Sequence, residues 1–190
     1  LANVAKWVIS RKELFDLDLS EPLYVACQHD QFVIVECLFL LTAIDVHEEE
    51  KKKGVSLLSF ACANGSLKVI QFLVATDLLE VDLSEINTEM GKSKGKTLLF
   101  VACEGGHLQV VRLLLKTNGH QLNQATDPFF NGQHVGELTP LYIACYNGHL
   151  DVIKLLLKTD GISVNKAKTD GVTPLIFAIQ MDRLDLVKLL

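Results

Sequence analysis

The sequence predicts an all-α solenoid, in which antiparallel helix pairs stack on one another. A short motif recurs five times, with Leu two residues and Ala five residues after a Thr, Ser or Glu; its copies begin at residues 21, 56, 97, 139 and 173. Their spacings are therefore 35, 41, 42 and 34 residues. Each copy is followed by a polar turn and a second apolar segment, a pattern typical of helical repeat proteins.

The first segment of each pair is expected to be a short, capped helix. The last four copies begin with a hydroxyl side chain that can cap a helix: Ser56, Thr97, Thr139 and Thr173. Pro140 and Pro174 then occupy the first helical position, where the missing N–H costs nothing. Each first helix is predicted to end at a left-handed residue. These residues are glycine or aspartate: Asp30, Gly65, Gly106, Gly148 and Asp182.

The second segments are predicted to be helices with a broad apolar stripe. They cover residues 32–41, 67–74, 108–115, 150–157 and 184–190. One helix pair cannot bury that stripe, so neighbouring pairs must cover it. Residues 3–9 read as a further second helix. We therefore expect one domain, 1–190, with a half repeat at 1–20, full repeats at 21–55, 56–96, 97–138 and 139–172, and a truncated repeat at 173–190.

The repeats resemble a known family. "TPLYIACYNGHLDVIKLLL" (139–157) and "TLLFVACEGGHLQVVRLLL" (97–115) are similar to the ankyrin-repeat signature, and so is "SLLSFACANGSLKVIQFLV" (56–74). The resemblance implies an L-shaped ankyrin solenoid with β-hairpin-like fingers projecting from one side. Two departures are clear. The histidine usual after "TPL" is replaced by Tyr24, Ser59, Phe100, Tyr142 and Ile176, and the linkers 82–96 and 124–138 exceed the usual ~33-residue period.

The resemblance also implies a function, the binding of a protein or peptide partner on the concave face and the fingers, without catalysis. The candidate residues lie at the ends of first helices and on fingers: Gln28, His29, Lys53, Lys94, Lys96, Glu104, Leu138, Tyr146, Asn147 and Asp170. Tyr146 is the strongest of them, because an exposed aromatic residue among small and polar neighbours is typical of a binding hot spot.

The long linker contains Phe129 and Phe130, followed by Asn131-Gly132, a strong signal for a tight turn. The turn would hold both aromatic rings near a projecting tip. Exposed paired aromatic residues reduce solubility unless something covers them. Two interpretations stay open: the rings fold back onto the neighbouring finger, or they contact a partner.

Asn123 and Asn165 occupy one repeated place, directly after Leu122 and Val164. In proteins that this chain resembles, that place is a target of an asparaginyl hydroxylase, so the resemblance implies possible hydroxylation at both residues. The alternative is that the side chain only forms hydrogen bonds within the finger turn.

The cysteines favour packing over chemistry. Cys27, Cys62, Cys103 and Cys145 fall at the same place in successive repeats. Stacked helices lie ~8–10 Å apart, beyond disulfide reach and too far apart for a tetrahedral zinc site. We expect no metal, no cofactor and no catalytic group. Free thiols in this number indicate a reducing compartment, cytoplasmic or nuclear.

Charge limits the classes of partner. The net charge of -5 is scattered along the chain, so we expect neither nucleic acid nor a membrane as partner. The chain begins at Leu1 and ends on an apolar segment, which suggests an interior part of a longer array, monomeric apart from end-to-end contacts through uncapped termini. Two other functions stay open: a positioning segment of a larger multidomain enzyme or secreted host-directed effector whose catalytic domain lies elsewhere, and a spacer without a ligand.

Overall fold

The computed structural model describes residues 20–42, 50, 56–75, 96–117, 122–126, 129–130, 133–134 and 137–190. The chain divides into two compact units, Leu1–Val81 (unit 1) and Asp82–Leu190 (unit 2). Each unit is described below by itself. The expected half helix at 3–9 and most of the linker 82–96 lie outside the described residues.

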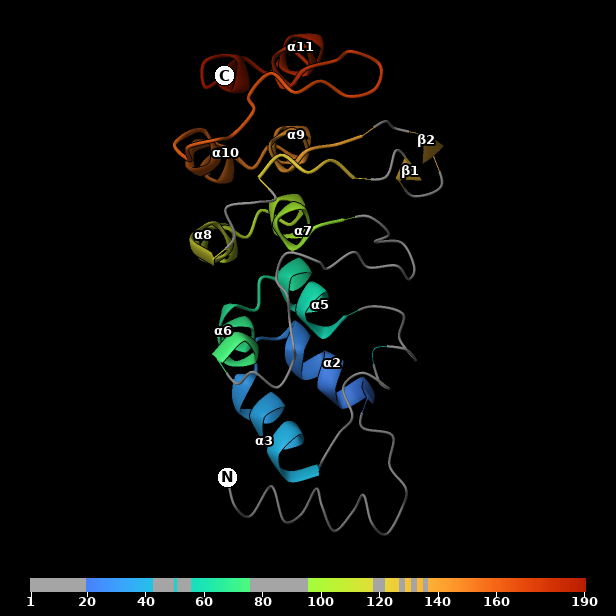
Figure 1. The fold of residues 1–190 in the computed structure, drawn as a ribbon, viewed down its shortest axis with the longest axis vertical. Helices are drawn as coiled ribbons and strands as arrows, with labels where there is room; N and C mark the ends of the chain where they lie inside the picture. Colours follow the sequence, from blue (N-terminus) through green and yellow to red (C-terminus); the bar gives the residue numbers. More distant parts are fainter. Residues whose placement is uncertain are drawn as a thin grey trace. The chain divides into compact units, whose positions relative to one another are not determined.

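The described part of unit 1 contains two helix pairs. The first consists of α2 (Ser20–Gln28) and α3 (Phe32–Thr42), and the second of α5 (Leu57–Asn64) and α6 (Leu67–Ala75). Helix α2 packs against α5, and α3 packs against α6. First helices therefore stack on first helices and second on second, as the repeat predicted (Figure 1).

Unit 2 continues the same pattern with three pairs. Its helices are α7 (Leu98–Glu104), α8 (Leu108–Thr117), α9 (Pro140–Asn147), α10 (Leu150–Leu157), α11 (Pro174–Gln180) and α12 (Leu184–Val187). Helices α7, α9 and α11 stack in a row, and α8 packs on α10. The second helices lie on one side of that row, and the loops that precede α9 and α11 extend on the other (Figure 1).

The long linker forms a β-hairpin. Strands β1 (Phe129–Phe130) and β2 (Gln133–His134) pair antiparallel, with Phe129 opposite His134 and Phe130 opposite Gln133. The hairpin-like finger predicted here is confirmed. The last helix differs from the prediction, because α12 ends at Val187 and the chain continues in a turn rather than in a helix to residue 190.

The predicted caps are confirmed. The side chain of each hydroxyl residue accepts a hydrogen bond from the N–H three residues later, as at Thr139 and Tyr142 (3.1 Å). The residues that end the first helices have positive φ: Asp30 (53°), Gly65 (73°), Gly106 (73°), Gly148 (76°) and Asp182 (53°). Local chemistry therefore fixes both ends of these short helices.

Aromatic contacts occupy the place of the missing histidines. Tyr24 meets Phe60 of the next pair edge-on, with ring centroids 5.0 Å apart. In unit 2 the equivalent residues are Tyr142 and Phe177, and their ring centroids are 5.7 Å apart. Such pairs contribute about 0.5–1.5 kcal/mol beyond the area they bury. The tyrosines thus join successive repeats through their rings.

The four cysteines at equivalent places, which we name the cysteine column, belong to the core, as predicted. Cys27, Cys62, Cys103 and Cys145 are free and buried, whereas Cys37 is only half-buried. Burial raises the pKa of the Cys27 and Cys145 thiols to about 12, and it raises the pKa of Cys62 and Cys103 further. These thiols stay protonated and pack as small apolar groups. Among the described helices, none is long and apolar enough to cross a membrane.

Candidate functional site

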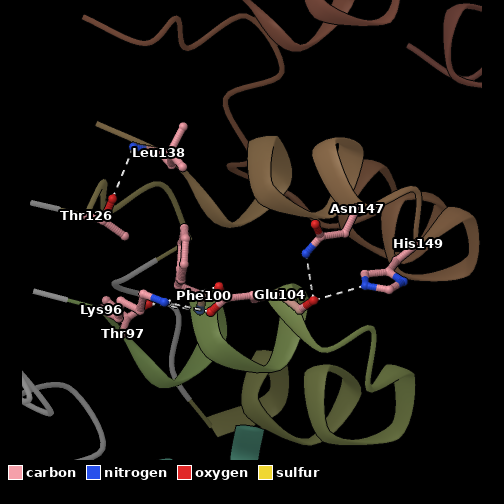
Figure 2. A network of polar contacts seen from close by, with 8 residues as sticks. All are labelled: Lys96, Thr97, Phe100, Glu104, Thr126, Leu138, Asn147 and His149. Atoms are coloured by element: carbon pink, nitrogen blue, oxygen red, sulfur yellow. Dashed lines mark hydrogen bonds and ion pairs between the residues drawn. The ribbon is translucent and has the colours of Figure 1, made fainter. Parts of the chain in front are cut away.

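A part-buried ion pair joins Lys96, which precedes α7, to Glu104, the last residue of that helix. The ammonium of Lys96 donates to both carboxylate oxygens of Glu104, at 2.8 and 3.1 Å, and lies 5.5 Å from the centroid of the Phe100 ring (Figure 2). Only 9% of Lys96 is exposed. Both residues were candidates for partner contact. Because the two charges neutralise each other, the pair presents little net charge to a partner.

The backbone carbonyl of Glu104 joins two helix pairs. It accepts hydrogen bonds from Nδ2 of Asn147, the last residue of α9 (2.8 Å), and from Nε2 of His149, in the turn that follows (3.0 Å) (Figure 2). Both side chains therefore stabilise the end of α7 in the preceding helix pair. Asn147 itself is exposed.

Tyr146 projects from the end of α9. Its side chain is 58% exposed, and its ring lies over Phe177 of α11, with centroids 5.5 Å apart and an interplanar angle of 31°. Met181, which follows α11, is 57% exposed. Phe177 itself is buried. An exposed ring is therefore held against a fixed neighbour.

The finger before α11 contributes a second neutral pair. The ammonium of Lys168 lies 2.9 Å from a carboxylate oxygen of Asp170 and 5.7 Å from the centroid of the Tyr142 ring. The hydrogen bond from Lys168 lowers the pKa of the exposed Asp170 carboxyl, and the N–H of Val172 adds to the effect. Burial raises the pKa of Tyr142 to about 12. Asp170, a predicted contact residue, is thus exposed and ionised.

Asn123 connects the two fingers of unit 2. Its Nδ2 donates to the carbonyl of Gly161 at 2.7 Å, and its Oδ1 accepts from the N–H of Ser163 at 2.7 Å. Lys166 donates to its carbonyl at 2.9 Å. These bonds fit the finger-turn interpretation, and hydroxylation of Asn123 stays a prediction. Asn165, at the equivalent place one repeat later, is exposed.

In unit 1 the predicted contact residues Gln28 and His29 are exposed. Asp30 beside them has a structural role, because its Oδ1 accepts from the N–H groups of Lys68 (2.9 Å) and Val69 (3.1 Å) and so caps α6. Ser66 also donates to the Cys27 carbonyl. Two side chains therefore join the helix pairs of this unit.

The remaining candidates divide into three groups. Leu138 was expected on the finger surface, and this was wrong: it is 5% exposed, because it exchanges hydrogen bonds with Thr126 and closes the base of the finger (Figure 2). Lys53 and Lys94 lie outside the described residues. Phe129 and Phe130 belong to β1, and the positions of their side chains lie outside the described structure, so both interpretations of them stay open.

Sequence reasoning missed the partners of the predicted residues. Phe177, which supports Tyr146, lies 31 positions later in the chain, and no local signal joins the two. Glu137 likewise donates its N–H to the Thr169 hydroxyl, at 3.2 Å, and joins neighbouring fingers. The contact between Tyr142 and Phe177 did have a signal in the sequence. Tyr24 and Phe60 occupy the equivalent positions of two earlier repeats and make the same contact.

Within the described ranges, no three His, Cys, Asp or Glu side chains come together as a metal site requires. A family model described as ankyrin repeats, in three copies, matches residues 23–126 and again 120–190. The chain therefore belongs to the ankyrin-repeat family. A comparison with curated proteins gives no significant match. Ankyrin repeats are in general protein–protein interaction modules, and they are typically non-catalytic.

Proposed function

We propose that the chain binds a protein or peptide partner on a surface of unit 2 formed by Glu104, Tyr146, Asn147, Gln180 and Met181, which we name the helix-end surface. Finger residue Asp170 extends it. The observation that supports the proposal is the combination of 58% exposure of Tyr146 with the contact of its ring on Phe177.

This combination favours binding for an entropic reason. A side chain that is ordered only on binding opposes affinity by about 0.5–1.5 kcal/mol. The ring of Tyr146 already rests on Phe177, so a smaller part of that cost remains. Met181 offers a second exposed apolar group after the next first helix. An aromatic anchor with an apolar neighbour and a polar rim is the usual composition of a hot spot.

The charged groups beside Tyr146 fit the polar rim of a binding surface rather than its centre. Lys96 with Glu104 and Lys168 with Asp170 are neutral pairs beside the apolar groups. A partner therefore need not carry a strong net charge to bind. We expect its contact to be an apolar side chain placed on Tyr146, with hydrogen bonds to Asn147 and Gln180.

The test compares two serine substitutions. Tyr146→Ser removes the proposed anchor, and Leu184→Ser removes an equally exposed side chain, 61% against 58%, from α12. Proteins captured from a lysate by the unchanged chain are identified, and the dissociation constant of the chief one is measured with all three forms. Tyr146→Ser should weaken binding by about thirtyfold, as for a hot spot of about 2 kcal/mol.

The result that would contradict the proposal is equal loss with Tyr146→Ser and Leu184→Ser, or no loss with either. The melting temperature of each variant is measured alongside, because Tyr146→Ser also removes the contact with Phe177. Phe129→Ser/Phe130→Ser separates the interpretations of the finger: lost binding with unchanged melting favours a partner contact, and a clear drop in melting temperature opposes it.

The free, buried thiols support a further part of the proposal, that the protein resides in a reducing compartment, the cytoplasm or the nucleus. Fractionation of cells that express the full-length protein would check it. Recovery in a secreted fraction with oxidised Cys37 would contradict it.

A further inference from the structure

Five cationic side chains lie on the second helices of unit 2 at two repeated positions. Arg112 in α8, Lys154 in α10 and Lys188 at the end of α12 are separated by 42 and 34 residues, the spacings of the motif itself. Lys116 and Lys158 lie one turn after the first two. All five are exposed. We name this set the basic ladder.

The ladder is the least compensated positive charge in the described part of unit 2. Three other cations there have close carboxylate partners: Lys96 with Glu104, Lys168 with Asp170, and Arg183 with Asp185 at 2.8 Å. Lys166 donates to the carbonyl of Asn123 instead. Within the ladder, the described residues provide one ion pair, from Lys154 to Asp151 at 3.6 Å. Those side chains are 52% and 75% exposed, so solvent screens the pair.

A structural role explains only part of the ladder. Cations near a helix C-terminus interact favourably with the helix dipole. This effect accounts for Lys116 and Lys154 in the last turns of α8 and α10, and for Lys158 and Lys188, the residues directly after α10 and α12. Arg112 lies in the middle of α8 and gains little from that effect. The equivalent positions in α3 and α6 of unit 1 hold Glu36 and Gln71. The fold therefore does not require a cation at this place.

We propose that the basic ladder binds an acidic segment of a partner protein, on the opposite side of unit 2 from its fingers (Figure 1). Neighbouring helices stack ~8–10 Å apart, and a polyproline II segment has three residues per turn with a rise of ~3.1 Å per residue. A carboxylate at every third residue of such a segment lies on one face at about the same spacing, so it matches Arg112, Lys154 and Lys188 in turn. This surface is separate from the helix-end surface, so the inference goes beyond the proposed function.

The arrangement of charge favours an acidic protein segment over nucleic acid. Asp151 and Asp185 stand in the first turns of α10 and α12, beside the ladder, and would repel a continuous row of phosphates. A peptide with spaced carboxylates avoids them. The 11 basic and 11 acidic residues of 82–190 also cancel, so unit 2 has no general attraction for polyanions.

The test uses the whole 190-residue chain and a fluorescent peptide of repeated Glu-Gly-Ser, with the Gln-Gly-Ser peptide as its uncharged control. Arg112→Gln/Lys154→Gln/Lys188→Gln removes one column of the ladder. Lys68→Gln/Lys92→Gln/Lys166→Gln removes the same charge elsewhere. At low salt, we expect the ladder variant to bind the acidic peptide about tenfold more weakly than the control variant, with a shallower dependence on salt.

Three further measurements make the result decisive. Tyr146→Ser should leave peptide binding unchanged, and Asp151→Asn should strengthen it about twofold, because it removes a repelling carboxylate. If the triple variant melts at a lower temperature, the single variant Lys154→Gln replaces it, and we expect that variant to weaken binding about threefold.

Equal binding of the acidic peptide by the ladder and control variants would overturn the proposal, and so would equal binding of the acidic peptide and the Gln-Gly-Ser peptide by the unchanged chain. Stronger binding to single-stranded DNA or to phosphatidylserine vesicles than to the peptide would overturn it as well.

Discussion

The imidazole of His149 lies directly against the backbone of Gly106. A Cβ atom placed on Gly106 would come within 2.5 Å of Nδ1 of His149, closer than real contacts allow. On its other side the ring donates to the carbonyl of Glu104. The same relationship recurs one repeat later, where the guanidinium of Arg183 lies 2.9 Å from a Cβ placed on Gly148. The ring of His149 therefore requires a glycine in the turn before it, whereas the flexible end of Arg183 can move away from an added Cβ.

This relationship predicts an unusually costly glycine substitution. Gly106→Ala should lower the free energy of unfolding by about 2–4 kcal/mol, through the positive φ of 73° and the clash with His149. Gly171→Ala is the matched control, because its φ is 84° but nothing lies within 4 Å of the added Cβ. We expect about 1 kcal/mol there. Urea unfolding measures both, and equal losses would refute the contact with His149.

The cap that Asp30 provides for α6 can be isolated from backbone strain. Asp30 and Asp182 both have a φ of 53°. Asp30 in addition accepts hydrogen bonds from two N–H groups of α6. Asp30→Ala should therefore cost about 1 kcal/mol more than Asp182→Ala. Amide hydrogen exchange at Lys68 and Val69 should also accelerate in Asp30→Ala. Unchanged exchange at both amides would show that the cap contributes nothing.

Thiol labelling should separate Cys37 from the cysteine column. Only the thiolate reacts quickly, and burial keeps Cys27 and Cys145 protonated by raising their pKa to about 12. At pH 8 a maleimide should modify half-buried Cys37 first, and the four column thiols only after denaturant is added. Mass spectrometry of the partly labelled protein gives the order. Early modification of Cys103 would show that the column opens in the native state.

The same thiols predict a loss of stability at alkaline pH. Their folded pKa values lie above the unfolded value of 9.0, so the unfolded state releases protons first as the pH rises. Stability is then complete below pH 9 and falls above it. At pH 10 each thiol should cost about 1 kcal/mol. Urea unfolding from pH 7 to pH 10 measures the slope, which Cys103→Ala should reduce. An equal slope in that variant would contradict the assignment.

Local features were predictable from the sequence because neighbouring residues determine them. The hydroxyl caps, the left-handed residues and the finger hairpin each depend on a few consecutive residues, and each is confirmed. The stacking of the pairs was predictable for a different reason, since the motif repeats. Cys27 and its three equivalents could be assigned to the core because one argument covers all of them.

Contacts that depend on the path of a linker or on the next helix pair were not predictable. Leu138 was assigned to the finger surface because its neighbours are polar, but its bonds with Thr126 depend on the path of a long linker. The partnership of Lys96 and Glu104 depends on how the linker enters α7. Asp30 looked like a tolerable substitute for glycine, and its cap on α6 became visible only when the next helix pair was in place.

Asn123 has a mechanical consequence. Its amide bonds Gly161 and Ser163 in the next finger, and the carbonyl of Glu104 bonds Asn147 and His149. Both sets of bonds join the α7/α8 repeat to the α9/α10 repeat, so tension along unit 2 would load them together. We expect the unit to lengthen under tension in discrete steps, and each step to be the unfolding of one helix pair. When the tension falls, each pair should refold on its neighbour.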